Sequence, residues 1–287
     1  MCDEITEAEN AEFVLNRREF AGLGAGAAAL ATLPGCATAA EAPTASRMVT
    51  IDTPDGKADA FFVYPKKGKH PAVIMWPDIA GLRDAYKTMG TRLAAAGYAV
   101  LVVNQYYRSS PAPILNSLME WRTPAGQDKL KPMIAAITPS GTTSDAAAFV
   151  SWLDAQKEVN AKKRIGSAGY CMGGPFTVRT AFANPARVGA AASFHGGGLV
   201  GPEADSPVNL IAKTRAAYLF AIAQNDDERA PKEKTQLRAA ADAAKRPAEV
   251  EVYPAQHGWC TIDAPIYDRA QAEKAWGRML ALFKANL

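Results

Sequence analysis

Residues 164–183 read RIGSAGYCMGGPFTVRTAFA and predict a strand, a tight turn and a helix in succession. Residues 164–168 are typical of a buried strand, and residues 174–183 have the apolar spacing of a helix. Between them, GYCMGG at 169–174 has the form of the GxSxG turn that lifts a serine nucleophile clear of the backbone. Cysteine stands in the serine position, so we expect Cys171 to be a nucleophile.

The surroundings predicted for Cys171 favour a thiolate. A helix that starts just after the turn presents unpaired N–H groups and the positive end of its dipole, and both stabilise a thiolate and a developing oxyanion. Free cysteines are, however, among the most buried residues, and most of them only fill space. A GxCxG turn is therefore weak evidence alone, and the case for catalysis depends on the residues that follow it.

Strand-like apolar runs alternate with helical patterns along most of the chain. PDG at 54–56 joins the first two runs as an antiparallel hairpin. The later alternation is typical of an α/β fold, a mostly parallel sheet with helices on both faces. The expected strands are 48–53, 58–64, 72–76, 99–104, 164–168, 189–194, 217–223 and 250–253, and the expected helices are 85–96, 144–156, 174–183, 232–244 and 268–287.

Two more residues follow later strands in the order of a catalytic triad. Asp227 comes after the strand at 217–223, and His257 comes after the strand at 250–253. Nucleophile, acid and histidine in this order, each at the carboxyl end of a strand, is the arrangement of the α/β-hydrolase triad. The sequence therefore predicts an α/β-hydrolase with Cys171, Asp227 and His257 as its catalytic residues.

Neighbouring side chains compete for these roles. Asp226 adjoins Asp227, and a solvated acidic turn would look the same, but position after the strand favours Asp227. His195 precedes the acid in the chain, which breaks the expected order, so we expect it to line the pocket. His70 comes before a strand, at the wrong edge of the sheet.

Two long connections interrupt the alternation, at 106–143 and 195–215. Both are rich in Pro, Gly and Ser, and loops this long tend to be functional. Both follow strands, so they are expected at the carboxyl edge of the sheet, where ligands bind in open α/β folds.

Composition excludes several classes of protein. With 287 residues, 48% hydrophobic and 21% charged, the chain suits one large core. Its 32 basic and 29 acidic residues are spread along the chain, which argues against a nucleic-acid partner. The cysteines at 2, 36, 171 and 260 and the three histidines lack the spacing of a zinc site or a disulfide scaffold. No metal or organic cofactor is expected, and the predicted protein is a monomer.

The first 39 residues differ in kind from the rest. NRREF at 16–20 precedes an apolar run of small residues at 21–33, typical of a twin-arginine export leader and too short for a membrane span of about twenty residues. An Arg-Arg pair before an ordinary Ala-rich helix is the alternative. ATA at 37–39 predicts cleavage to a periplasmic protein, whereas LPGC at 33–36 would instead anchor a lipid on Cys36. The predicted parts are the leader at 1–39, a linker at 40–47 and one domain at 48–287.

From Met48 to Leu287 the chain resembles the dienelactone hydrolase family. The resemblance rests on GYCMGG at 169–174, on Asp227 before Pro231, on HG at 257–258 and on PDIAG at 77–81. It implies a carboxymethylenebutenolidase-like hydrolase, which opens a small-molecule ester or lactone through a Cys-His-Asp triad and a thioester intermediate.

The same resemblance implies roles for further residues. The backbone N–H groups of Ile79 and Met172 would form an oxyanion hole, and Asp78 would lie beside the resting thiol. Arg108 matches one of the arginines that bind a substrate carboxylate in the family. The residues expected to bind substrate or to activate the thiol are Asp78, Arg108, Tyr170, His195 and Trp259.

The chain departs from the family pattern in ways that concern the substrate. Family members that act on dienelactone carry a glutamate where this chain has Asp78, and GWCT at 258–261 offers no second arginine. A periplasmic address also fits poorly with a cytoplasmic ring-cleavage product. We therefore expect an ester or lactone of broader kind than dienelactone.

Two other classes of function compete with hydrolysis. The fold could be a catalytically silent ligand-binding protein, or Cys171 could serve redox chemistry with Cys260, three residues beyond His257. A disulfide between Cys171 and Cys260 would be compatible with an oxidising periplasm.

Overall fold

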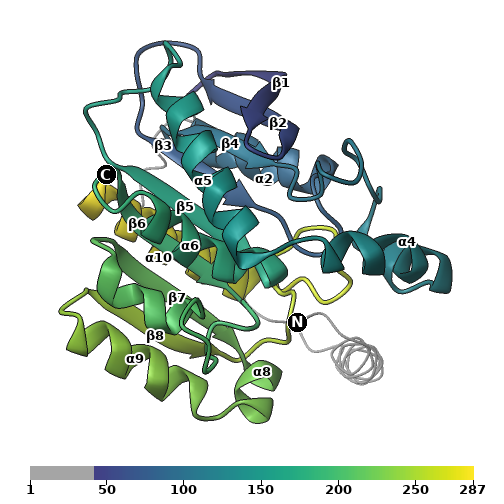
Figure 1. Cartoon of the computed structure of the whole chain (residues 1–287), viewed down its shortest axis with the longest axis vertical. Helices are drawn as coiled ribbons and strands as arrows, with labels where there is room; N and C mark the ends of the chain where they lie inside the picture. The colour runs from purple at the N-terminus through teal and green to yellow at the C-terminus, as the bar shows by residue number, and fades with distance from the viewer. Residues whose placement is uncertain (1–41) are drawn as a thin grey trace, which may run out of the picture.

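The computed structural model describes residues 42–287, which form an eight-stranded sheet in the order β1-β2-β4-β3-β5-β6-β7-β8. Strands β3 to β8 pair in parallel, and β1 and β2 pair in antiparallel fashion. The predicted α/β fold with an N-terminal hairpin is confirmed (Figure 1). The leader predicted at 1–39 lies outside the described residues.

The strands are β1 (Thr44–Thr53), β2 (Gly56–Pro65), β3 (Ala72–Trp76), β4 (Ala99–Val103), β5 (Ile165–Tyr170), β6 (Val188–Phe194), β7 (Ala217–Ala223) and β8 (Ala248–Tyr253). The helices are α2 (Asp84–Ala95), α3 (Leu118–Trp121), α4 (Pro124–Ala135), α5 (Pro139–Asp154), α6 (Gly174–Ala183), α7 (Pro207–Leu210), α8 (Gln224–Arg229), α9 (Glu233–Ala243) and α10 (Arg269–Asn286), with short 3-10 turns η1 (Cys171–Gly173) and η2 (Ile211–Lys213).

The hairpin starts earlier than the sequence predicts. Thr44 pairs with Pro65 and Arg47 with Phe62, so residues 44–47, expected as linker, belong to β1. The Arg47 guanidinium also bonds both carboxylate oxygens of Glu158, at 3.0 and 3.4 Å. The Pro- and Ala-rich composition of this segment predicts a linker. Its backbone pairing with β2 and the ion pair between Arg47 and Glu158 instead make it part of the sheet.

Both faces of the sheet are covered by helices, and the core lies in two layers. Helices α5, α6 and α9 contribute Phe149, Phe176 and Leu237 to one layer. Helices α2 and α10 contribute Leu93 and Phe283 to the other. The five residues of β3 and of β4 are all buried, as expected for parallel strands covered on both sides.

The first long connection, predicted as a loop, contains helices. Thr123 and Thr138 each accept a hydrogen bond from the backbone N–H three residues later, and each precedes a proline at the first helical position. These are strong start signals for a helix, so α4 and the first turn of α5 were recognisable from the sequence. Within residues 42–287 no helix is long and apolar enough to cross a membrane, and no cluster of potential metal ligands occurs.

Candidate active site

The turn that carries Cys171 is strained and tightly packed. Cys171 has φ of +53°, a left-handed conformation that is unfavourable for a residue other than glycine. A Cβ on Gly169 would lie 2.0 Å from the carbonyl oxygen of Gly173, and a Cβ on Gly173 would lie 2.4 Å from that of Trp76. Only glycine fits at either position. The packing therefore sets Cys171 between the end of β5 and the start of α6.

His257 is oriented by two side chains of α8, which follows β7. Its Nδ1 lies 2.7 Å from Oδ2 of Asp226, and its backbone N–H donates to Oδ1 of Asn225 at 2.8 Å. The Asp226 contact leaves Nε2 as the nitrogen available for chemistry, because Nδ1–H donates to the carboxylate. His257 is 1% exposed, so this orientation is held in a buried setting.

Charge at the site couples three groups. Burial disfavours the imidazolium of His257, but Asp226 and then Cys171 outweigh burial and raise the pKa of His257 to about 10. Burial likewise opposes ionisation of Asp226, but the charge and hydrogen bond of His257 lower its pKa. The arrangement therefore favours a protonated His257 between an ionised Asp226 and Cys171.

The predicted choice of Asp227 over Asp226 is wrong about which carboxylate contacts His257. Asp227 accepts from Nζ of Lys234 at 2.6 Å, on another side of α8. Consecutive residues of a helix point about 100° apart, so only one of the two carboxylates can face His257. The sequence does not show that these residues are helical rather than part of a loop, and the register of α8 decides between them.

His195 lies beside His257, and Trp259 lies beside His195. The His195 ring centroid is 4.9 Å from that of His257 and 5.1 Å from that of Trp259. His195 has φ of +41° and is 1% exposed. Burial lowers the pKa of His195, so it stays neutral beside the charged His257. Tyr170, in contrast, packs behind the turn, stacked on Phe194 with ring centroids 4.9 Å apart.

The segments predicted to form the oxyanion hole are neighbours. Gly173, next to Met172, packs against the carbonyls of Trp76 and Pro77, just before Ile79. Met172 lies in η1, the first turn after β5. The backbone N–H groups at the start of a helix have no carbonyl acceptor within the helix, so they can bind an oxyanion. Tyr106, which the sequence did not single out, donates its hydroxyl to the Ile79 carbonyl at 2.7 Å and holds that loop. The oxyanion hole itself stays a prediction.

Asp78 forms an ion pair with Arg83 and is therefore not a free carboxylate beside the thiol. The Arg83 guanidinium donates to both Asp78 oxygens at 2.7 and 2.9 Å, and Ala80 N–H donates to one of them at 2.9 Å. Arg83 also bonds both oxygens of Asp263, which follows His257. Although burial opposes it, this pairing raises the pKa of Arg83. Arg83 thus joins the Ile79 loop to the His257 loop.

Arg108 does not present a free cation to the site, which corrects its expected role. Its guanidinium donates to both oxygens of Asp145 at 2.7 and 2.9 Å, and to Asp55 at 2.5 Å. It lies over the Tyr107 ring at 4.6 Å. These contacts tie the hairpin turn to α5, so Arg108 has a structural role.

The side chains around Cys171 are mainly apolar. Helices α3 and α4 and the loop after His257 share one cluster with Cys171. Its members include Ile79, Tyr106, Ile114, Leu115, Leu118, Trp121, Leu130, Ala264 and Ile266. A substrate that reaches Cys171 would therefore meet hydrophobic walls.

A sequence model of the dienelactone hydrolase family matches residues 58–287. The chain belongs to the dienelactone hydrolase family. It is accordingly an α/β-hydrolase of a family that acts on esters and lactones.

Relatives and solved structures agree with this membership. A protein of Escherichia coli (strain K12) named "Putative carboxymethylenebutenolidase" is 29% identical over 233 residues, which is 78% of this chain and 81% of that protein. A crystal structure titled "Putative Dienelactone Hydrolase" from Klebsiella pneumoniae is 25% identical, with a TM-score of 0.70 over 84% of this chain and 99% of that one. A dienelactone hydrolase-like promiscuous phosphotriesterase from metagenomic libraries shares the fold, with a TM-score of 0.68 and 20% identity over 85% and 98%.

Proposed function

We propose that this dienelactone hydrolase-family protein hydrolyses uncharged esters or lactones with Cys171 as nucleophile, His257 as acid and base, and Asp226 as the group that orients His257. The observation that carries the proposal is the 2.7 Å contact between His257 Nδ1 and Asp226, next to a cysteine on a strained turn. The pKa of His257, raised by Asp226 and Cys171, supports a resting thiolate–imidazolium pair.

Acylation begins when the Cys171 thiolate attacks the carbonyl carbon. The carbonyl electron pair moves onto oxygen, and the oxyanion receives hydrogen bonds from the N–H groups of Met172 and Ile79. Collapse of this intermediate breaks the carbon–oxygen bond, and the leaving oxygen takes the proton of His257. A thioester on Cys171 remains, and with a lactone the new hydroxyl stays attached to the acyl group.

Deacylation uses the same groups in reverse. Neutral His257 takes a proton from water, and the hydroxide attacks the thioester carbonyl. The second oxyanion collapses, releases the carboxylic acid and expels the Cys171 thiolate. Asp226 holds the protonated His257 through its Nδ1–H, and the resting ion pair is restored.

The expected substrate is uncharged because Arg83 and Arg108 are occupied by carboxylates of the protein. Arg83 bridges Asp78 and Asp263, and Arg108 bridges Asp55 and Asp145. The cluster around Cys171 is apolar, and burying a substrate carboxylate there without a partner would be costly. The relatives named carboxymethylenebutenolidase support a lactone as one substrate class.

The test of the thioester is a rapid acid quench during turnover of a chromogenic short-chain ester. Peptide mass spectrometry is expected to find the acyl group on the peptide that contains Cys171 in the wild type, and not on the matching peptide of a Cys171→Ala variant. Turnover with the acyl group on a serine peptide, or with no covalent species in the wild type, would contradict the mechanism.

An Arg108→Ala variant is expected to lose stability and not substrate selectivity. The free energy of unfolding should fall by about 2–4 kcal/mol, because Asp145 would stay buried without its partner. Denaturant unfolding measures this change, and esters with and without a carboxylate measure selectivity. A selective loss on the carboxylate-bearing ester would restore Arg108 as a substrate-binding residue.

The raised pKa of His257 predicts a pH dependence of stability. A free histidine has a pKa of about 6.5, so between that value and about 10 His257 keeps a proton in the folded protein that it has lost in the unfolded chain. The stabilisation is complete below this window and is lost as pH rises through it. The comparison is made in a Cys171→Ala background, because a Cys171 thiolate in the folded protein would offset the proton on His257, whereas Asp226 still raises the pKa of His257 there. The free energy of unfolding should fall more steeply with pH in Cys171→Ala than in a Cys171→Ala, His257→Gln double variant, and parallel curves would refute the raised pKa of His257.

A further inference from the structure

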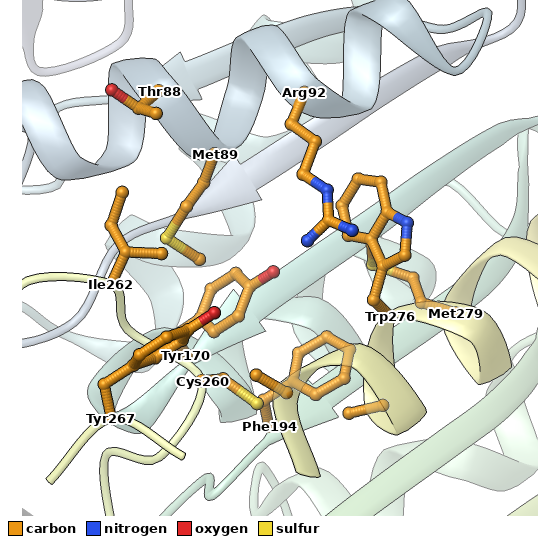
Figure 2. Close-up of a pocket in the computed structure, with 12 residues that line it drawn as sticks. Thr88, Met89, Arg92, Tyr170, Phe194, Cys260, Ile262, Tyr267, Trp276 and Met279 are labelled. Carbon is orange, nitrogen blue, oxygen red and sulfur yellow. The ribbon is translucent and has the colours of Figure 1, made fainter. Parts of the chain in front are cut away.

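A cavity lies behind the turn that carries Cys171, on the face of the sheet covered by α2 and α10. Its volume is about 80 Å³. The lining is mainly apolar and includes Met89, Phe194, Ile262, Trp276 and Met279 (Figure 2). Thr88 and Ile262 are exposed, so they mark the side that opens to solvent. Neither Cys171 nor His257 lines this cavity.

One buried polar group points into this apolar space. Figure 2 shows the Tyr170 hydroxyl directed into the cavity toward Arg92, and Tyr170 is 3% exposed. No residue of 42–287 hydrogen-bonds to this hydroxyl. Burial raises the pKa of Tyr170, so the hydroxyl keeps its proton and can donate it. The hydroxyl has no acceptor from the protein at the wall of an apolar cavity, and a ligand with an acceptor oxygen would supply one.

The charges around the cavity cancel. The Arg92 guanidinium bonds both oxygens of Glu273 at 2.8 and 2.6 Å and lies over the Trp276 ring at 4.1 Å. Cys260 contributes a thiol, and burial raises its pKa well above the usual value, so this wall is uncharged. Cys171 and Cys260 form no disulfide with each other in the structure. The cavity therefore offers mainly apolar walls, the buried Tyr170 hydroxyl and no net charge, and the hydroxyls of Thr88 and Tyr267 also belong to its lining.

From these observations we propose that the cavity binds a small, uncharged, mainly apolar molecule that carries one acceptor oxygen, such as a simple phenol, alcohol or ketone. The Tyr170 hydroxyl donates to that oxygen, and Met89, Phe194 and Met279 contact the apolar part. The volume is about half that of a cavity that encloses benzene, roughly 150 Å³, and the open side accommodates the rest of a single ring.

This site is placed to affect the catalytic groups without being part of them. Tyr170 immediately precedes Cys171, and Cys260 follows His257 by three residues. A bound molecule would therefore contact the segments that carry both side chains. The binding proposal does not depend on which ester, if any, Cys171 hydrolyses.

The experiment compares phenol with toluene, which has nearly the same shape but lacks the oxygen. Each is titrated by ligand-observed NMR into the full chain and into a Tyr170→Phe variant. We expect Tyr170→Phe to weaken phenol binding by roughly three- to tenfold, the effect of one hydrogen bond, and to leave toluene binding unchanged. No binding of either molecule to the wild type, or the same ratio of the two affinities in both proteins, overturns the proposal.

A second pair of variants locates the bound molecule and does not require a change in the core. Thr88→Trp places a large side chain at the open side of the cavity, from an exposed position on α2. Ser151→Trp is the matched control: it places the same side chain at an exposed position on α5, across the sheet and away from the cavity. Thr88→Trp is expected to abolish binding, and Ser151→Trp to leave it unchanged. Unchanged binding in Thr88→Trp, or equal losses in both variants, would show that the molecule binds elsewhere.

Discussion

A Cys171→Ala variant is expected to lose roughly four to six orders of magnitude in kcat/KM for a chromogenic short-chain ester. The sulfur is the only atom that forms the proposed covalent bond, and removal of a nucleophile leaves only the rate that binding and oxyanion donors supply. Steady-state hydrolysis measures the loss, and thermal unfolding of the same sample verifies that the variant is folded.

A Cys171→Ser variant is the matched comparison. A hydroxyl in the same place is a weak nucleophile at neutral pH, because it is not ionised as a thiolate is. Its rate should therefore lie far below that of the wild type. Hydrolysis by Cys171→Ala at the rate of the wild type would place the reaction elsewhere, and hydrolysis by neither wild type nor variant on a panel of esters and lactones would favour a binding protein.

An Asp226→Asn variant is expected to lose about 10⁴-fold in kcat, and Asp227→Asn is expected to lose little. The amide keeps the shape of Asp226 but donates where the carboxylate accepts, so it favours the wrong tautomer of His257 and no longer stabilises the imidazolium. Asp227 bonds Lys234, and its replacement does not change the hydrogen bonds of His257.

The comparison of Asp226→Asn with Asp227→Asn tests which of the two carboxylates orients His257, a choice that only the structure makes. Both substitutions change one oxygen to nitrogen in adjacent residues of α8, so their effects on solubility and net charge are alike. The measurement is kcat for the same ester, with the pH profile recorded for each variant. Equal losses in the two variants, or a larger loss in Asp227→Asn, would return the role of the acid to Asp227.

Local sequence patterns were enough for the sheet and for the turn that carries Cys171. The turn at 169–174 is predicted correctly because only glycine permits the approach of β5, α6 and β3 at that point. His257 is found because it follows the last strand, and parallel strands end at one edge of a sheet. Thr123 and Thr138, each a capping residue followed by a proline, also carried a signal for α4 and α5 that the length of the connection obscured.

Contacts over long distances in the sequence were not predictable. Arg83 and Asp263 are 180 positions apart, and no local pattern relates them. Arg108 matches a family position, yet Asp145 and Asp55 occupy its guanidinium. Because a guanidinium has five donors in a fixed geometry, its partners depend on which carboxylates the fold brings near it.

The sequence by itself determined the α/β architecture, the placement of Cys171 on its turn and the histidine that follows the last strand, because these depend on periodicity and on the steric demands of glycine. Only the tertiary structure decided that Asp226 orients His257, that Arg83 and Arg108 are occupied, and that the Tyr170 hydroxyl points into a cavity. Each of these depends on direction around a helix or on a partner far along the chain, and the packed fold alone specifies both.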